Sequence, residues 1–237
     1  TTTAVSVSST TVTGGVSAID TAYNSSGISG LGNEAITVDS GTASVFEANT
    51  LDALTSGVVT ATITNNDIAT LDTLTGVGNA YTISVTDTTV SAEKLNALDL
   101  KTSVAVNVLS SSITGSVTDL AFVYSTNGLT GLGNEALTVD SGTVSVDDVN
   151  VGSGLTTGTL TATVTEGDMA TLSGIEESGN ALSVTVTDAS VSAADLTTLD
   201  SKTTVAVQVE SSTLTGTNAE QIAAYAANKA GTITGLE

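Results

Sequence analysis

GLGNEA occupies residues 30–35, and the same six letters return at residues 131–136. Pairing residues 1–101 with residues 102–202, without a gap, gives 49 identical positions, and a third copy begins at Thr203. Self-similarity at a fixed period is typical of repeat architectures. The sequence therefore predicts a tandem array with a period of 101 residues, and we expect the 237 residues to be a section of a longer array.

A shorter unit recurs four times within each period. In the second copy TSVAVNV (102–108), EALTVDSG (135–142), TLTATVT (159–165) and ALSVTVTD (181–188) alternate apolar with small polar residues, as half-buried strands do. A short helix is expected after each strand, and we call one strand, turn and helix a coil. The expected coils are 1–27, 28–57, 58–78 and 79–101 in the first copy, 102–128, 129–158, 159–179 and 180–202 in the second, with 203–237 a partial third copy.

The helix signal is a Ser or Thr followed three residues later by an acid. In a capping box the hydroxyl accepts from the third amide of the helix, and the acid reaches back to the first residue. The expected N-caps are Ser44, Thr64, Ser91, Ser116, Ser145, Thr165, Ser192 and Thr217. The pattern is imperfect at Ser91, where Lys94 takes the acid's position. DDVNVGSG (147–154), with two glycines, predicts a coil in which a loop replaces the helix.

Coils of 21–30 residues in tandem favour a β-rich solenoid with parallel strands, because no coil can bury its apolar face alone. The glycines of the two hexapeptides, Gly30, Gly32, Gly131 and Gly133, are expected to form a tight turn into the next strand. The alternative is a string of immunoglobulin-like β-sandwiches, since about 100 residues is also the size of those modules. The absence of Pro and Trp, and the helix signals, favour the solenoid.

Composition excludes several classes of function. A net charge of −21 repels phosphate backbones, so no nucleic-acid partner is expected. The chain has no apolar run long enough to insert in a membrane. Since His and Cys are absent, the usual nucleophilic triads and zinc sites are not available, and we expect no enzymatic activity.

Calcium is the cofactor for which the sequence offers a mechanism. Four acids follow the last strand valine of successive coils, namely Asp140, Glu166, Asp188 and Glu210. If these coils stack at strand spacing, the acids form a column of oxygen ligands suited to a hard cation. The other interpretation is that acids at strand ends and helix starts favour turns.

Three stretches carry a family resemblance: SAADLTTLDSKTTVAVQV (192–209), TGLGNEALTVDSG (130–142) and TLTGTNAEQIAAYA (213–226). They resemble the repeat modules of very large tandem-repeat proteins of marine cyanobacteria and of the phages that infect them. The resemblance implies an extracellular, cell-surface or virion-surface fibre, filament or matrix protein whose partners are neighbouring copies of the same repeat. The alternative is an adhesin stalk that presents a face to a glycan or a cell-surface receptor.

Overall fold

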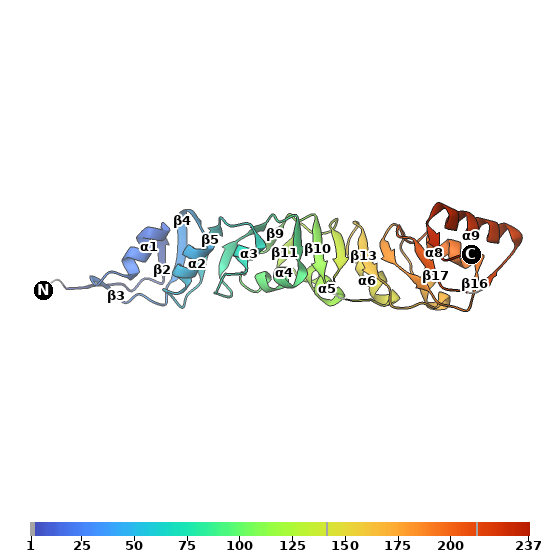
Figure 1. The fold of residues 1–237 in the computed structure, drawn as a ribbon. Coiled ribbons are helices and arrows are strands. Elements are labelled where there is room, and N and C mark those ends of the chain that lie inside the picture. The colour runs from blue at the N-terminus through green and yellow to red at the C-terminus, as the bar shows by residue number, and fades with distance from the viewer. Residues whose placement is uncertain (1–2, 141, 212) are drawn as a thin grey trace. The chain divides into compact units, whose positions relative to one another are not determined.

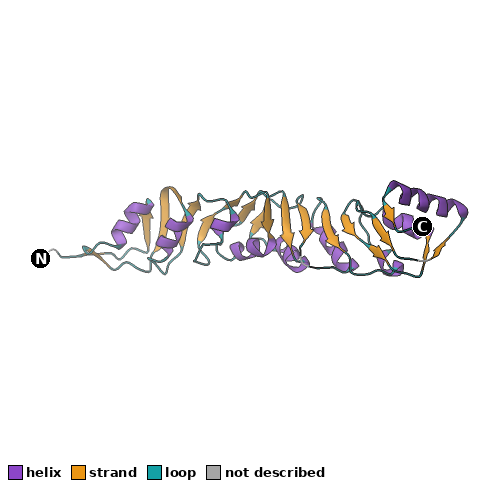
Figure 2. Ribbon diagram, in the orientation of Figure 1, coloured by secondary structure: helices purple, strands orange, loops and turns teal. Residues whose placement is uncertain are grey.

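The computed structural model describes residues 3–140, 142–211 and 213–237. The chain divides into two compact units, one formed by Thr1–Ser110 with Ser125–Leu132 and the other by Ser111–Tyr124 with Gly133–Glu237. Each unit is α/β and contains parallel strands in open sheets with short helices beside them (Figures 1 and 2). The described residues form no closed barrel. The expected strands and short helices are therefore confirmed.

The first unit contains three sheets, with the strand orders β1-β3, β2-β4-β5-β6 and β7-β9-β11. Its strands are β1 (Val5–Ser6), β2 (Thr11–Gly14), β3 (Ile28–Ser29), β4 (Ala35–Ala43), β5 (Val59–Ile63), β6 (Ala80–Thr82), β7 (Ser84–Val85), β8 (Thr89–Ser91), β9 (Val106–Val108) and β11 (Leu129–Thr130). Its helices are α1 (Val16–Tyr23), α2 (Val45–Asp52), α3 (Ile68–Leu71) and α4 (Ala92–Asp99). Paired residues such as Thr13 and Thr37, or Thr37 and Thr60, belong to successive predicted coils.

The second unit repeats this pattern. Its hydrogen-bonded strands follow the orders β10-β12-β13-β14, β15-β17-β19 and β16-β18. The strands are β10 (Ser112–Gly115), β12 (Ala136–Val139), β13 (Leu160–Thr163), β14 (Ala181–Ser183), β15 (Thr185–Val186), β16 (Ser190–Ser192), β17 (Val207–Val209), β18 (Thr213–Thr215) and β19 (Ile233–Thr234). The helices are α5 (Val117–Ser125), α6 (Val146–Leu155), α7 (Met169–Leu172), α8 (Ala193–Asp200) and α9 (Asn218–Ala230). Thr114 pairs with Thr138, and Thr138 pairs with Thr161, in the register that the first unit uses.

The strand pairs that the structure describes are parallel in both units. Immunoglobulin-like sandwiches are built from antiparallel sheets. The alternative of tandem sandwiches is therefore wrong for these residues.

The core consists of small branched side chains placed by two periodicities. Along β5 the side chains of Val59, Ala61 and Ile63 are buried, while those of Thr60 and Thr62 face solvent. On the helices the buried positions recur every third residue, as in Ala193, Leu196 and Leu199 of α8. Strand alternation and helical spacing thus meet in one apolar layer within each unit.

The prediction that DDVNVGSG forms a loop is wrong, because these residues belong to α6. A capping box between Ser145 and Asp148 starts the helix, and Val146 and Val149 are buried. Gly152 is also buried, and a Cβ atom there would lie 3.1 Å from Leu160. Packing against β13 therefore outweighs the low helix propensity of glycine.

Six of the eight predicted N-caps lie directly before a helix. Complete capping boxes form at Ser44, Ser145 and Thr217. The hydroxyls of Ser116 and Ser192 accept from the amides of Asp119 and Asp195. Ser91 has the N-cap position of α4 but makes no side-chain capping bond.

The predictions for Thr64 and Thr165 are wrong. The N-caps of α3 and α7 are Asp67 and Asp168, whose carboxylates accept from the third helical amides. Thr64 and Thr165 lie at strand ends, where their N–H groups donate to the carbonyls of Ala43 and Val144. A threonine three residues before an aspartate fits both arrangements, and the strand pairing decides between them.

The capping geometry gives a matched pair of variants. We expect Ser44→Ala to lower the free energy of unfolding by about 1 kcal/mol, because the Glu47 amide loses its acceptor and the box is broken. Ser91→Ala is expected to change it by less than about 0.5 kcal/mol, since Ser91 makes no capping bond. Urea unfolding followed by circular dichroism measures both, and equal losses would contradict the assignment.

Candidate functional site

The repeated hexapeptide forms the turn predicted for it. The φ angles are 86° at Gly30 and 137° at Gly32, and 85° at Gly131 and 132° at Gly133. Side-chain-bearing residues rarely adopt these values. The prediction for all four glycines is confirmed.

The first glycine of each turn also lies against the backbone of an earlier strand or turn. A Cβ atom on Gly30 would lie 2.6 Å from the carbonyl oxygen of Val7, and one on Gly131 would collide with the carbonyl oxygen of Val108. Gly235, in the partial third copy, has a φ of 90° and lies in the same way against Val209. The position therefore requires glycine for two reasons, its φ angle and the close backbone contact.

The glutamate of the hexapeptide was not among the predicted site residues, yet its side chain is buried in both copies. Glu34 and Glu135 are each only 2% exposed. The Glu34 carboxylate accepts from the Gly32 amide at 2.7 Å and from the Tyr23 hydroxyl at 3.1 Å. Glu135 accepts from the Gly133 amide at 2.8 Å and from the Tyr124 hydroxyl at 2.7 Å.

A tyrosine stands 11 residues before this glutamate in both copies, and that shared spacing was the available signal. The carboxylate links the turn to the helix of the preceding coil, α1 in the first unit and α5 in the second. We call Tyr23 with Glu34, and Tyr124 with Glu135, the Tyr–Glu pairs.

Hydrogen bonding sets the charge state of the first pair. The Gly32 amide holds the pKa of Glu34 below its ordinary value, against the opposing effect of burial. Burial, followed by the nearby Glu34 carboxylate, raises the pKa of the Tyr23 hydroxyl. Burial also raises the pKa of Tyr124. The tyrosines therefore remain protonated donors at neutral pH.

The lowered pKa of Glu34 predicts a pH-dependent contribution to stability. A carboxylate with a lowered folded-state pKa stabilises the fold above its unfolded pKa, and this contribution is lost as the pH falls through the folded value. We expect Glu34→Gln to unfold at lower urea than the wild type at pH 7, and the difference to shrink below about pH 4. Tyr23→Phe removes one donor and should give a smaller difference. A wild-type-to-Gln difference that did not vary with pH would contradict this role.

A set of Ser and Thr hydroxyls, which we call the turn row, stabilises short turns along the chain. Ser25, Thr55, Thr102, Thr126, Thr156 and Thr203 each accept from the N–H group two residues later, at 2.9–3.2 Å. The hydroxyls of Thr55 and Thr156 donate to the carbonyls of Glu34 and Glu135, at 2.6 and 2.8 Å. Four of these hydroxyls, those of Thr55, Thr102, Thr156 and Thr203, thus satisfy one amide and one earlier carbonyl with the same side chain. The Thr126 hydroxyl donates to the Asp99 carboxylate instead.

Two buried asparagines add a second link. The side-chain oxygen of Asn79 accepts from the Val59 amide at 2.8 Å, and its nitrogen donates to the Asp52 carboxylate at 2.8 Å. The side-chain oxygen of Asn180 accepts from the Leu160 amide at 2.9 Å. The backbone amide in question lies 20 residues earlier in each case, one coil back.

The acids proposed for the calcium column have other roles or lie at the surface. Glu166 accepts from the Val146 amide at 3.2 Å, and Asp188 accepts from the Met169 amide at 2.7 Å, so each caps a helix of the preceding coil. Asp140 and Glu210 are exposed. Within residues 3–140, 142–211 and 213–237, no three His, Cys, Asp or Glu side chains gather closely enough to hold a metal ion. Calcium binding therefore stays a prediction without a site in the described structure.

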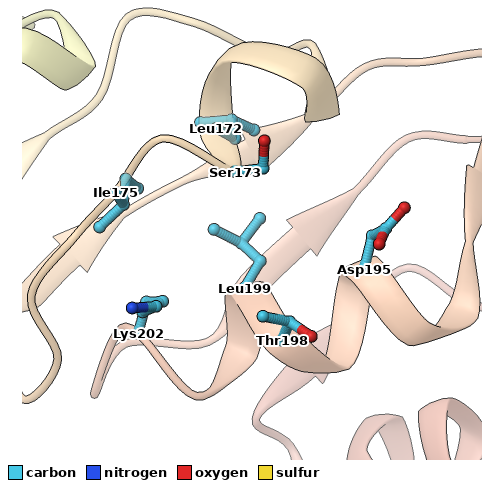
Figure 3. A pocket seen from close by; sticks show the side chains of 7 residues that line it. All are labelled: Leu172, Ser173, Ile175, Asp195, Thr198, Leu199 and Lys202. Carbon is cyan, nitrogen blue, oxygen red and sulfur yellow. The ribbon is translucent and has the colours of Figure 1, made fainter.

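A small pocket lies between α7 and α8 in the second unit (Figure 3). Its volume is about 50 Å³, and Leu172, Ile175 and Leu199 form its apolar lining. The Lys202 ammonium, which also lines it, donates to the Glu176 carbonyl at 2.6 Å. In the first copy Asp72 and Lys94, which replace Ser173 and Asp195, form a salt bridge at 3.4 Å. The pocket has room for a water molecule and is too small for a cofactor.

Of the helices that the structure describes, none combines the length and the apolar character needed to cross a bilayer. Comparisons with protein-family models, with curated proteins and with solved structures give no match to this chain.

Proposed function

We propose that the chain is a section of a β-rich solenoid that serves as structural material, a stiff fibre, filament or matrix. The observation that carries this proposal is the register of the parallel strands. Val12 pairs with Ile36, Ala61 with Tyr81, and Leu137 with Leu160, so that each strand lies beside the matching segment of the next coil. In such a stack each coil pairs with the coil before it, so that further coils can be added in the same direction.

The polar links described above support the same proposal. Each Tyr–Glu pair and each buried asparagine joins a coil to its predecessor. The hydroxyls of Thr102 and Thr203 do the same by donating to the carbonyls of Tyr81 and Leu182. Such links recur with the period of the sequence instead of gathering at one site, as expected where every coil has the same structural task. The partners in this proposal are neighbouring copies of the repeat.

An extracellular, cell-surface or virion-surface location is part of the proposal. It rests on the resemblance to repeat modules of marine cyanobacteria and their phages, and on the net charge of −21, which keeps a long apolar-cored object soluble. No catalytic role is proposed.

Immunogold electron microscopy tests this function directly. Antibodies raised against the 237-residue chain are applied to the cells or particles from which it comes. Gold along filaments or on an outer surface is the expected result. Gold confined to the cell interior, without filaments, would overturn the proposal.

A binding role as an adhesin stalk is the second candidate. It is favoured by differences between the two copies at exposed positions. Phe46 on α2 is 80% exposed and is replaced by Asp147 on α6, and Val77 is 71% exposed and is replaced by Ser178.

A further inference from the structure

An open polar groove lies in the second unit, at the end of α6 and the start of β14. Its volume is about 360 Å³, and Ser153, Thr157, Glu177, Ser178 and Asn180 contribute polar groups to it. This volume falls within the range of about 300–1,000 Å³ that is typical of small-molecule sites. No other feature described above uses Glu177.

Asn180, one of the residues that line the groove, carries a side-chain donor without a protein partner in the described structure. The residue is only 4% exposed, and its side-chain oxygen is held by the Leu160 amide. Because an amide side chain that accepts with its oxygen must direct its nitrogen elsewhere, the orientation of Nδ2 is fixed. That nitrogen has no hydrogen-bond partner among the residues that the structure describes. It is not among the fully buried atoms that lack a partner, so it is open to the groove, where a bound ligand can accept from it.

In the first copy the position that corresponds to the groove, beside Asn79, is filled by the chain's own side chains. There the Asn79 nitrogen donates to the Asp52 carboxylate at 2.8 Å, and a Cβ atom on Gly76 would lie 2.5 Å from that carboxylate oxygen. The first copy therefore closes the place with its own side chains and leaves no room for a larger residue at position 76.

In the second copy the asparagine has no such carboxylate partner among the described residues. Ser153 replaces Asp52, and its hydroxyl turns back to donate to the Val149 carbonyl at 2.9 Å. Glu177 replaces Gly76 and brings an exposed carboxylate to the rim. The two substitutions together leave a donor without a side-chain acceptor, Asn180 Nδ2, in the same groove as an acceptor, Glu177.

We propose that this groove binds a neutral, hydroxyl-rich ligand, a saccharide. An acceptor oxygen complements the Asn180 donor, and a hydroxyl donor complements the Glu177 carboxylate. A sugar hydroxyl supplies both. Anions are repelled by Glu177 and by the net charge, and a single carboxylate does not make a metal site. The groove has no aromatic platform, so millimolar affinity is expected. The site does not depend on whether the repeats build a fibre.

Nuclear magnetic resonance of the 237-residue chain tests the proposal. The probes are glucose, galactose and N-acetylglucosamine, with glucuronate as the anionic control. The side-chain amide signals of Asn180 should shift saturably with at least one neutral sugar, while those of Asn79 stay in place and glucuronate has no effect. The proposal is overturned by unmoved Asn180 signals, by equal shifts at Asn79, or by equal binding of glucuronate.

A pair of exchanges between the copies gives the matched controls. Ser153→Asp supplies the missing acceptor for Asn180 and should weaken sugar binding at least about tenfold, a difference readily resolved in a titration. Asp52→Ser with Gly76→Glu opens the first copy and should make the Asn79 signals respond. Thermal unfolding establishes that both variants remain folded. Unchanged sugar binding by a folded Ser153→Asp chain contradicts the proposed site.

Discussion

Replacement of Gly131 by Ala is expected to lower the free energy of unfolding by about 2–5 kcal/mol. Two costs add at this position. A left-handed φ of 85° costs an L-residue about 1–2 kcal/mol. The new Cβ atom also collides with the Val108 carbonyl oxygen, and overpacking of this kind costs about 1–3 kcal/mol. Urea unfolding followed by circular dichroism measures the total.

Gly78 offers the control for this variant, because its φ is 72° and a Cβ atom there meets nothing within 4 Å. Gly78→Ala should therefore show only the conformational cost of about 1–2 kcal/mol. If both variants lost the same stability, the close contact between the GLGNEA turn and the preceding strand would have no energetic weight, and the account of the repeated hexapeptide would be wrong.

Leu98→Ala is expected to lower the free energy of unfolding by about 2–5 kcal/mol, because it removes a fully packed side chain and leaves a cavity. Leu98 lies on α4 and is 1% exposed. In a thin core of small branched side chains, few neighbours can move to fill the space. The same urea experiment measures the loss.

The control is two residues away, at Leu100, which is 67% exposed. Leu100→Ala should change the stability by less than about 0.5 kcal/mol. A large loss at Leu100 would mean that a partner covers this surface, and a small loss at Leu98 would mean that the helices do not form the apolar layer.

The sequence was most informative where structure depends on near neighbours. The capping boxes at Ser44, Ser145 and Thr217 involve residues three positions apart, and all three were predicted and are present. The turn glycines were found in the same way, because the left-handed conformation at Gly30 and Gly131 is a local requirement.

The predictions were wrong where a residue is positioned by the coil before or after it. Asp87 and Asp188 accept amides of α3 and α7, which lie about one coil earlier, so these helices begin later than Thr64 and Thr165 suggested. The prediction that Glu166 and Asp188 share a calcium column overlooked the same bonds. Local patterns identify the acids as significant, but only the pairing of the coils assigns their partners.

The Tyr–Glu pairs and the Asn180 groove also depend on contacts between different coils, which the sequence does not reveal. The 11-residue spacing from Tyr124 to Glu135 is visible in the sequence, yet nothing local requires a contact across it. The replacement of Asp52 and Gly76 by Ser153 and Glu177 is also visible, but it acquires meaning only when Asn79 and Asn180 are seen at the same place in each coil.

Solution X-ray scattering from chains with two, three and four tandem copies of the 101-residue repeat tests the stacking of the coils most directly. If the four coils of each copy stack at a strand spacing of about 4.8 Å, the maximum dimension grows by about 19 Å per copy. A compact module of about 100 residues has a radius of gyration of about 13 Å, so separate modules would add about 34 Å each. A constant increment near 19 Å is the predicted result, and an increment of about 34 Å or more would contradict a continuous solenoid.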